Sequence, residues 1–451
     1  MTVRPAVFDH SPLCAWTLRP TKAMLPNAAW LLSLAVLGLP LSAEEPLPKI
    51  EGTYGAKYGQ CFQSLPGETG ALNLGQRWED PSPTATLYID LRTVTSAASS
   101  FDFRTFDPEG VIFYGDTNPG KDWFVLALRK GKPEMQIHNA VTNLTVSGGM
   151  RLNDGRWHRL MVKNEGDVVI MEVDGDDQLV LRHVSSSVID HPVFAMRIGV
   201  GGLFIPAQEL LTPLNTAMDG CMRRWNWLNK TSEWREGSSL EEEGTKVCFP
   251  SIRPGSFFPG NGLATFSLAD LPTGLNPANG NWSLALEMRI EGAPQAASLL
   301  AVSSAKHAPV LRLDLRHTDL VAQLGNKTVF MAPLPAEGCL DLQLRVRITS
   351  SHFALCLANA ETLKPIPKTD SDRLKQIWLG QRGDLTIGGS PGLERSPLAQ
   401  ERGFFRGCLQ AIRVQGQELD LDSAQSRSNS IWAHSCPGPE DGGKDNVDDG
   451  N

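Results

Sequence analysis

The chain has 451 residues, more than one hydrophobic core ordinarily organises, so two or three domains are expected. Hydrophobic residues make up 41% of the chain, which is typical of globular proteins. The net charge is −8 and no basic stripe is present, so we expect no nucleic-acid partner.

The N-terminal 43 residues predict a secretory signal peptide. Arg19 and Lys22 precede an apolar run over residues 28–39, and small residues follow up to Ala43. The run is shorter than the about 20 residues that a membrane span needs, which argues against a membrane anchor. We therefore expect a secreted, extracellular protein with no membrane span, and a disordered acidic tail over residues 437–451.

Short alternating apolar runs, bounded by glycine and aspartate, predict an all-β fold made of antiparallel sandwiches. The clearest runs flank Lys130-Gly131, which predicts a two-residue hairpin loop. That loop would set four pairs on one face: Leu128 with Pro133, Leu126 with Met135, Phe124 with Ile137, and Asp122 with Asn139.

This register places an acid beside an amide at the end of an apolar face, and two interpretations are open. The pair could lie at an exposed sheet edge or cap a turn. Alternatively, it could form a polar clamp at the rim of an apolar pocket, because ligand sites are mostly apolar with a few placed polar groups. A ligand hydroxyl would then satisfy the Asp122 carboxylate and the Asn139 amide.

A weak repeat divides the chain. The same 18-residue interval separates Gly202 from Gly220 and Gly389 from Gly407, and a cysteine follows the second glycine each time. The next cysteines lie at similar distances, so the repeat predicts the disulfides Cys221–Cys248 and Cys408–Cys436. Residues 251–255 read as a linker between the two modules.

Four cysteines remain outside this scheme. Cys14 would leave with the signal peptide, and an odd number, Cys61, Cys339 and Cys356, would stay in the mature chain. A hairpin turn near residues 349–352 does not bring Cys339 opposite Cys356, so we expect buried thiols.

No catalytic motif is present: GxSxG, Walker, HExxH and Rossmann patterns are all missing, so we expect no enzyme and no catalytic cofactor. The turn at residues 107–110 carries two acids, Asp107 and Glu109, and is either a solvated turn or a calcium site. Sequons at Asn143, Asn229, Asn281 and Asn326 are candidate glycosylation sites.

Residues 101–116, 154–158 and 219–221 together resemble laminin G-like domains, and the tandem arrangement resembles the laminin G-like family of steroid carriers. The resemblance implies two jelly-roll domains, over residues 87–250 and 251–436, after a partly disordered extension over 44–86. It implies an androgen or oestrogen ligand in the first domain, and a homodimer formed through the first domains. The alternative is a calcium-dependent adhesion or receptor-ligand protein of the protein S type.

Carried over residue by residue, the resemblance implies that Ser99 meets the steroid's ring A oxygen and that Asp122 and Asn139 meet the hydroxyl at the other end. The remaining expected pocket residues are Phe113, Phe124, Ile137, Val162, Asn164, Val169, Met196 and Leu228, with Asn164 making part of the wall more polar than in a mammalian member, which has methionine there. Calcium would be held by the Asp107 side chain and by the carbonyls of Glu109 and Ala217.

Overall fold

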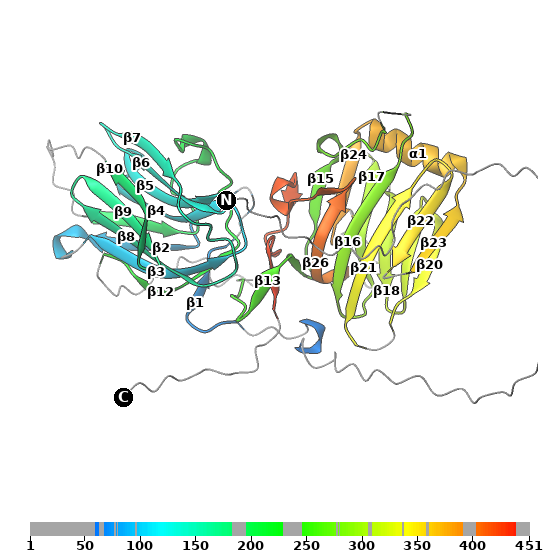
Figure 1. Ribbon diagram of the computed structural model, residues 1–451, viewed down its shortest axis with the longest axis horizontal. Coiled ribbons are helices and arrows are strands. Elements are labelled where there is room, and N and C mark those ends of the chain that lie inside the picture. Colours follow the sequence, from blue (N-terminus) through cyan, green and yellow to red (C-terminus); the bar gives the residue numbers. More distant parts are fainter. Residues whose placement is uncertain are drawn as a thin grey trace, which may run out of the picture.

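The computed structural model describes residues 59–62, 67–75, 78, 80–94, 97–182, 195–228, 246–276, 278, 280–304, 309–335, 338–357, 360–390 and 403–438. The expected signal peptide, Asn229 and most of the acidic tail lie outside these residues. Two β-sandwiches stand side by side in the described part of the chain (Figure 1), which confirms the predicted all-β fold. One helix, α1 (Lys368–Leu379), packs on the second sandwich through Leu374 and Trp378.

The first sandwich consists of two antiparallel sheets of six described strands each. The first sheet has, in spatial order, β1 (Ala71–Asn73), β12 (Gly220–Asn226), β3 (Ala98–Thr105), β8 (His158–Glu165), β9 (Val168–Val173) and β10 (Asp176–Arg182). The second sheet has β2 (Ala85–Asp90), β11 (Ala195–Val200), β4 (Gly110–Asn118), β5 (Asp122–Arg129), β6 (Lys132–His138) and β7 (Asn143–Ser147).

The second sandwich repeats this plan. One sheet has β14 (Ser256–Pro259), β26 (Arg406–Val414), β16 (Leu284–Gly292), β21 (Leu340–Ile348), β22 (His352–Leu357) and β23 (Ala360–Pro365), with β27 (Gln417–Glu418) beside β26. The other has β20 (Lys327–Pro333), β19 (Asp319–Leu324), β18 (Pro309–Arg316), β17 (Ala297–Ser304), β24 (Gly383–Ile387), β15 (Ala264–Ser267) and β28 (Ser426–Arg427), with β25 (Gly403–Phe404) beside β17.

Alternation of side chains explains why these segments form half-buried strands. In β9 and β21, every second residue is buried and the residues between them are more exposed. The buried set of each sandwich forms one continuous apolar core between its two sheets. Burial of that apolar area is the main stabilising contribution to each domain.

The repeat seen in the sequence extends to backbone conformation. Arg224 has a φ of 49° and Ala411 a φ of 47°, and each lies three residues after the repeat cysteine of its domain. Both sit where the strand pairing shifts register, so each domain carries a bulge at the same place. The structure joins Cys221 to Cys248 and Cys408 to Cys436, the two pairs that the repeat predicts.

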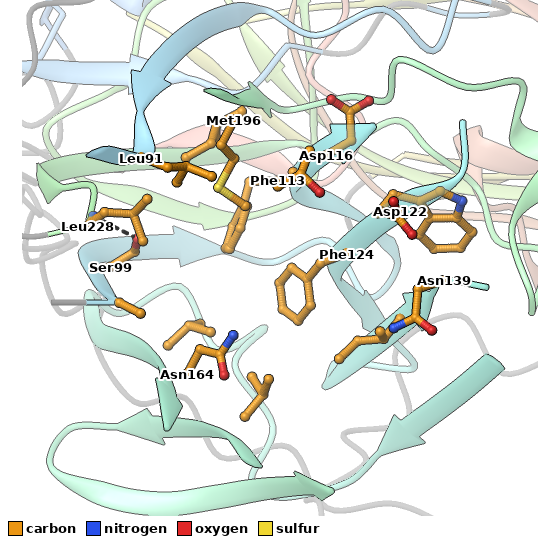
Figure 2. Close-up of a pocket in the computed structure, with 18 of the residues that line it drawn as sticks. Leu91, Ser99, Phe113, Asp116, Asp122, Phe124, Asn139, Asn164, Met196 and Leu228 are labelled. Carbon is orange, nitrogen blue, oxygen red and sulfur yellow. Dashed lines mark hydrogen bonds between the residues drawn. The ribbon is translucent and has the colours of Figure 1, made fainter. Parts of the chain in front are cut away.

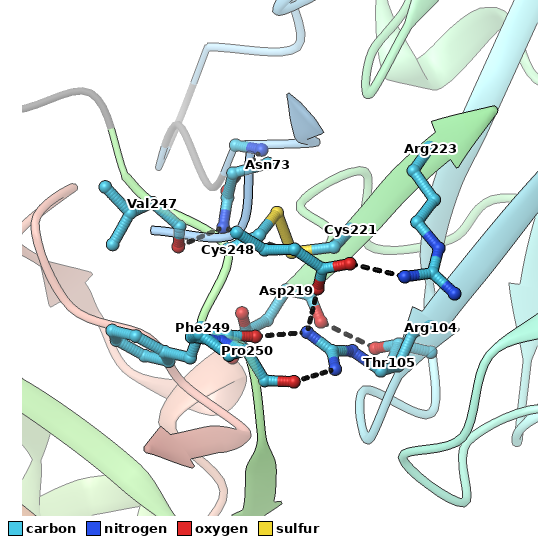
Figure 3. Close-up of a disulfide and its surroundings, with 12 residues drawn as sticks. Asn73, Arg104, Thr105, Asp219, Cys221, Arg223, Val247, Cys248, Phe249 and Pro250 are labelled. Atoms are coloured by element: carbon cyan, nitrogen blue, oxygen red, sulfur yellow. Dashed lines mark hydrogen bonds and ion pairs between the residues drawn. A yellow bond between two sulfur atoms is a disulfide. The ribbon is translucent and has the colours of Figure 1, made fainter. Parts of the chain in front are cut away.

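Hydrogen bonds fix the end of the first domain and also join the two sandwiches to each other. Arg104 of β3 donates to the carbonyls of Phe249 and Pro250, close to the Cys221–Cys248 disulfide (Figure 3). The Asp219 carboxylate accepts from the backbone N–H groups of His434 and Ser435, each at 2.9 Å. The residues expected to form a linker are partly ordered as well, because β13 (Ile252–Pro254) pairs with β29 (Ser435–Pro437).

The expectation of buried thiols is wrong. Cys61, in the short 3-10 helix at Gly59–Phe62, is bonded to Cys339 next to β21, with their Cα atoms 5.4 Å apart. Cys356 is disulfide-bonded too, and no free cysteine occurs among the described residues. The N-terminal extension is therefore covalently attached to the second sandwich, while its strand β1 pairs with β12 of the first.

Candidate functional site

A cavity of about 370 Å³ opens between the two sheets of the first sandwich (Figure 2). All of the residues that the resemblance assigned to a steroid site line it: Ser99, Phe113, Asp122, Phe124, Ile137, Asn139, Val162, Asn164, Val169, Met196 and Leu228. Its volume falls within the range of small-molecule sites, about 300–1,000 Å³. Most of the lining is apolar, so the cavity fits a rigid apolar ligand with few polar groups.

The β5–β6 hairpin forms one wall of the cavity. Leu128 pairs with Pro133, Leu126 with Met135, and Phe124 with Ile137, as the two-residue loop predicts. Lys130 and Gly131 both have positive φ, at 52° and 78°, which this type of loop requires.

The last predicted pair is wrong in detail. The hairpin ladder stops at Trp123 and His138, and the ladder partner of Asp122 is Asn118 on β4. Asn139 leaves the strand because its Oδ1 accepts from the backbone N–H groups of Val141 and Thr142, at 2.9 and 2.8 Å. Asp122 and Asn139 nevertheless line the same end of the cavity, so Asn139 both caps a turn and faces the pocket.

Three polar groups at the cavity differ in what they can still bind. Ser99 is 6% exposed, and its Oγ accepts from the Leu228 N–H at 3.1 Å, which leaves the hydroxyl proton free to donate. Asn139 has only its amide Nδ2 left, because Oδ1 serves the turn. No group in the described part of the chain donates to the half-buried Asp122 carboxylate. One end of the cavity therefore offers a donor, and the other an acceptor beside a donor.

Aromatic rings hold the floor of the cavity in place. Phe113 packs against Phe124, Phe101 and Trp227, with ring centroids 5.6, 5.9 and 5.1 Å apart. Phe101 and Trp227 are fully buried, so Phe113 is supported from below. Pairs of this kind add about 0.5–1.5 kcal/mol each beyond their buried area, which favours a preformed wall.

Sequence reasoning missed several lining residues: Leu91, Val94, Ala97, Gly115, Asp116, Thr117, Trp123, His138 and Ile198. Ile198 reaches the cavity because β11 pairs with β4, and its partner Gly115 lies 83 residues away in the chain, so no local pattern reveals the contact. Asp116 is charge-paired with Arg197 and is not free to bind a ligand. Trp123 and His138 belong to the predicted hairpin, but alternation places them on the face opposite Phe124 and Ile137, so the pattern did not mark them as lining residues.

In the described part of the second sandwich, apolar residues replace Ser99 and Asp122, while Asn139 keeps a counterpart: Leu315 pairs with Leu320 as Leu128 pairs with Pro133, so the exposed Asn326 stands at its position. Cys408 pairs with Glu291 in the second sandwich as Cys221 pairs with Arg104 in the first. Ser99 lies five residues before Arg104, and Leu286 lies five residues before Glu291, so Leu286 stands at the position of Ser99. Leu300 pairs with Leu313 in the second sandwich as Phe113 pairs with Leu126 in the first. Asp122 lies four residues before Leu126, and Pro309 lies four residues before Leu313, so Pro309 stands at the position of Asp122. Leu286 is 2% exposed and belongs to the apolar core, which fills the space between the sheets.

The acidic turn lies at the junction of the two sandwiches. Asp107 is 1% exposed, so the interpretation as a solvated turn is wrong. Its carboxylate accepts from the N–H groups of Glu109 and Asp219 at 3.0 and 2.8 Å. The Ala217 carbonyl lies beside the same turn, close enough that a Cβ on Gly110 would sit 2.3 Å from it.

A group of three possible metal ligands forms where this turn meets the second sandwich: Asp107, Asp422 and His434. The His434 Nε2 lies 2.8 Å from Asp422 and 3.6 Å from Asp107. Burial by itself would lower the pKa of His434, but the two carboxylates raise it above its usual value, so the imidazole is a cation between two acids. Burial raises the pKa of Asp107, opposed chiefly by His434.

These residues fit a calcium ion in part. Two carboxylates and nearby backbone carbonyls are the oxygen donors that calcium takes. The His434 imidazole, which calcium does not favour, already supplies positive charge between them. A bound ion would therefore have to displace that side chain from the space between the acids.

Three of the four sequons lie in the described part of the chain. Asn143, Asn281 and Asn326 are exposed, and Asn326 follows the turn glycine between β19 and β20. Asn143 lies on the edge strand β7, where its Oδ1 contacts the ring of His138 at 2.5 Å. Their accessibility permits glycosylation, and use of each sequon stays a prediction.

Comparison with known proteins identifies the fold family of this architecture. The family model for the laminin G domain matches residues 103–233. Domains LG4-5 of the mouse laminin alpha1 chain superpose with a TM-score of 0.59 at 19% identity, covering 84% of this chain and 98% of that one. The fold is therefore that of a tandem laminin G-like protein, with an internal cavity in its first domain.

Among curated proteins, the sex hormone-binding globulin of Rattus norvegicus is 39% identical over 358 residues, covering 79% of this chain and 84% of that protein. The one of Homo sapiens is 39% identical over 365 residues, covering 80% and 86%. Growth arrest-specific protein 6 of Mus musculus is 30% identical over 395 residues, but the match covers only 57% of that protein. The chain belongs to the sex hormone-binding globulin family, which is non-enzymatic.

Two further observations concern the compartment of the protein. Three disulfides that join described cysteines to each other fit an oxidising, extracellular compartment. Helix α1 has 12 residues, and nowhere in the described ranges is there a helix apolar and long enough to cross a bilayer.

Proposed function

We propose that this protein is a secreted carrier that binds an androgen or oestrogen reversibly in the cavity of its first laminin G-like domain. The observation that supports this proposal is an apolar cavity of about 370 Å³ with Ser99 at one end and Asp122 and Asn139 at the other. A rigid four-ring ligand loses little conformational freedom on binding, so apolar contact plus polar groups at both ends suffice. The similarity to proteins named as sex hormone-binding globulins supports the choice of ligand.

The polar groups have distinct roles in this proposal. The Ser99 hydroxyl donates to the ring A oxygen, because its own oxygen is already occupied by the Leu228 N–H. The ring D hydroxyl donates to the Asp122 carboxylate and accepts from the Asn139 Nδ2. Phe113, supported by the rings beneath it, packs against the apolar body of the steroid.

The rival function is a calcium-dependent adhesion or receptor-ligand protein. Similarity to growth arrest-specific protein 6 and to vitamin K-dependent protein S favours it, at 30% and 27% identity. Such a protein does not require an internal apolar cavity, and it would bind its partner through a surface. The cavity therefore favours the carrier.

Thermal unfolding of the full-length protein separates the two functions. A ligand that binds only the folded state stabilises it by about 2.7 kcal/mol at a concentration 100 times its Kd. We expect androgens and oestrogens to raise the Tm, and a steroid without oxygen at either end to leave it unchanged. A Tm that no steroid moves would exclude the carrier function and favour the surface-binding alternative.

We also propose that calcium binds at the domain junction, through Asp107, Asp422 and the carbonyls of Glu109 and Ala217. The buried Asp107 carboxylate and the Asp422 carboxylate lie close together with only the His434 side chain between them, which supports a calcium site here. Added calcium should raise the Tm of wild-type protein and not that of Asp107→Asn. Equal response of both proteins would show that calcium does not bind through Asp107 at this junction.

A homodimer through the first domains completes the proposal. Each sheet of the first sandwich ends in a described edge strand, β7 or β10, with unpaired backbone groups. Analytical ultracentrifugation should give a dimer mass, and lysine substitutions on β7 should shift it toward the monomer. A monomer at micromolar concentration would exclude this assembly.

A further inference from the structure

We propose that Asn164 recognises a third oxygen on the central rings of the steroid, so that the cavity prefers steroids oxygenated at both ends and between them. This inference rests on the proposed carrier function, and it assigns to Asn164 a role in selectivity.

Asn164 faces the cavity because of strand alternation. On β8, Leu160, Val162 and Asn164 share one face, and the first two belong to the apolar core of the first sandwich. Across the strand pair, Asn164 stands opposite Val169, which is 5% exposed and lines the same cavity. The amide is thus placed at the rim of an apolar wall.

The position lies between the two polar ends. Val162 pairs with Ser99, and Asn164 lies two residues beyond Val162 on the same strand. Asn164 is therefore about 7 Å further along the strand than the level of Ser99. Asp122 belongs to the opposite sheet, and Asn139 directly follows the end of its strand β6. Figure 2 shows Asn164 on the other side of the Phe124 ring from Asp122 and Asn139. A steroid that reaches both ends would pass its central rings over the Asn164 amide.

The side chain is free to bind. The backbone N–H of Asn164 donates to the Ala97 carbonyl at 2.9 Å, but no described residue bonds its side-chain amide. An amide offers both an acceptor and a donor, so it can bind either an alcohol or a ketone. In the absence of ligand the exposed amide is satisfied by water.

A bound ligand changes this balance. When a steroid covers the cavity, the amide loses water, and an unpaired buried amide is costly. A central oxygen on the steroid would replace that water, and its own loss of solvent would be compensated as well. A steroid without this oxygen leaves the Asn164 amide without a partner, which produces selectivity.

The test compares full-length wild-type protein with Asn164→Leu and Asn164→Asp in competition binding. The ligands are one parent androgen and its derivatives that carry an alcohol or a ketone on ring B or ring C. We expect the affinity of at least one derivative, relative to the parent, to be about 5- to 20-fold lower in Asn164→Leu than in wild type. Because an ionised carboxylate only accepts, Asn164→Asp should retain the preference for an alcohol and lose that for a ketone.

Glu165→Gln is the matched control, since Glu165 is the next residue along the strand, is exposed and does not line the cavity. It should show the same relative affinities as wild type. If every protein gives the same relative affinities, Asn164 does not select and this inference is overturned, although the carrier function stands. If wild-type protein fails to bind even the parent steroid, the carrier function itself is overturned and this inference falls with it.

Discussion

Replacing Asp122 with asparagine should change how the cavity distinguishes a ring D hydroxyl from a ring D ketone. In the wild type, a hydroxyl can donate to Asp122 and accept from the Asn139 Nδ2. A ketone can only accept, so it would leave the carboxylate without a partner. An asparagine at position 122 supplies an N–H in place of the lost acceptor, and the ketone should gain relative to the hydroxyl.

The magnitude follows from burial. A hydrogen bond to a charged group contributes about 1.5–3 kcal/mol. Asp122 is only half buried, so we expect the lower end of that range, about 1.5 kcal/mol or roughly tenfold in relative affinity. Competition binding with a steroid pair that differs only in this group measures the ratio directly.

Asn139→Asp gives a second, independent test of the same end. An aspartate can still accept from the N–H groups of Val141 and Thr142, so the turn should be retained. It has no donor for the ligand, so both steroids should bind more weakly. An unchanged hydroxyl-to-ketone ratio in Asp122→Asn would refute the assigned roles and return the pair to a purely structural function.

Three other predictions concern stability and the cavity. Cys61→Ser should lower the free energy of unfolding by about 2–4 kcal/mol in chemical denaturation, because it opens a link across 278 residues; no loss would show that the N-terminal segment is held by packing alone. His158 bonds Asp154 and Asp174 at 3.0 and 2.8 Å. Burial alone would raise the pKa of both acids, but hydrogen bonds and His158 lower it overall. The ionised acids therefore stabilise the folded state fully above about pH 4, and this contribution is lost as the pH falls through the lowered pKa values. Wild type should thus lose more stability than Asp154→Asn between pH 5 and pH 2 in acid unfolding, and parallel curves would contradict this. Gly115→Val should fill part of the cavity and reduce steroid affinity at least tenfold with the protein still folded; full affinity would place the ligand elsewhere.

Local patterns predicted the parts of the site that are local. The Lys130-Gly131 loop and its alternating flanks were enough to fix the register from Leu128–Pro133 to Phe124–Ile137. The pattern failed at Asn139, because an asparagine can leave the ladder by bonding its own turn, and alternation does not report that competition.

Long-range contacts could not be predicted in this way. Cys61 and Cys339 lie 278 residues apart, and a single sequence offers no pattern that joins them. In the same way, the local sequence left the acidic turn open between a solvated turn and a calcium site, because the residues that cover it, His434 and Asp422, come from the other domain. The repeat succeeded where these failed, since two copies of one spacing constrain the disulfides of both domains.

Equilibrium dialysis of the full-length protein against a radiolabelled androgen tests the central claim most directly. The cavity occurs in the first sandwich, while the matching space of the second is filled by Leu286 and its neighbours. We therefore expect saturable binding of one steroid per chain, displaced by unlabelled androgen. Absence of saturable binding, or saturation at two steroids per chain, would contradict the account.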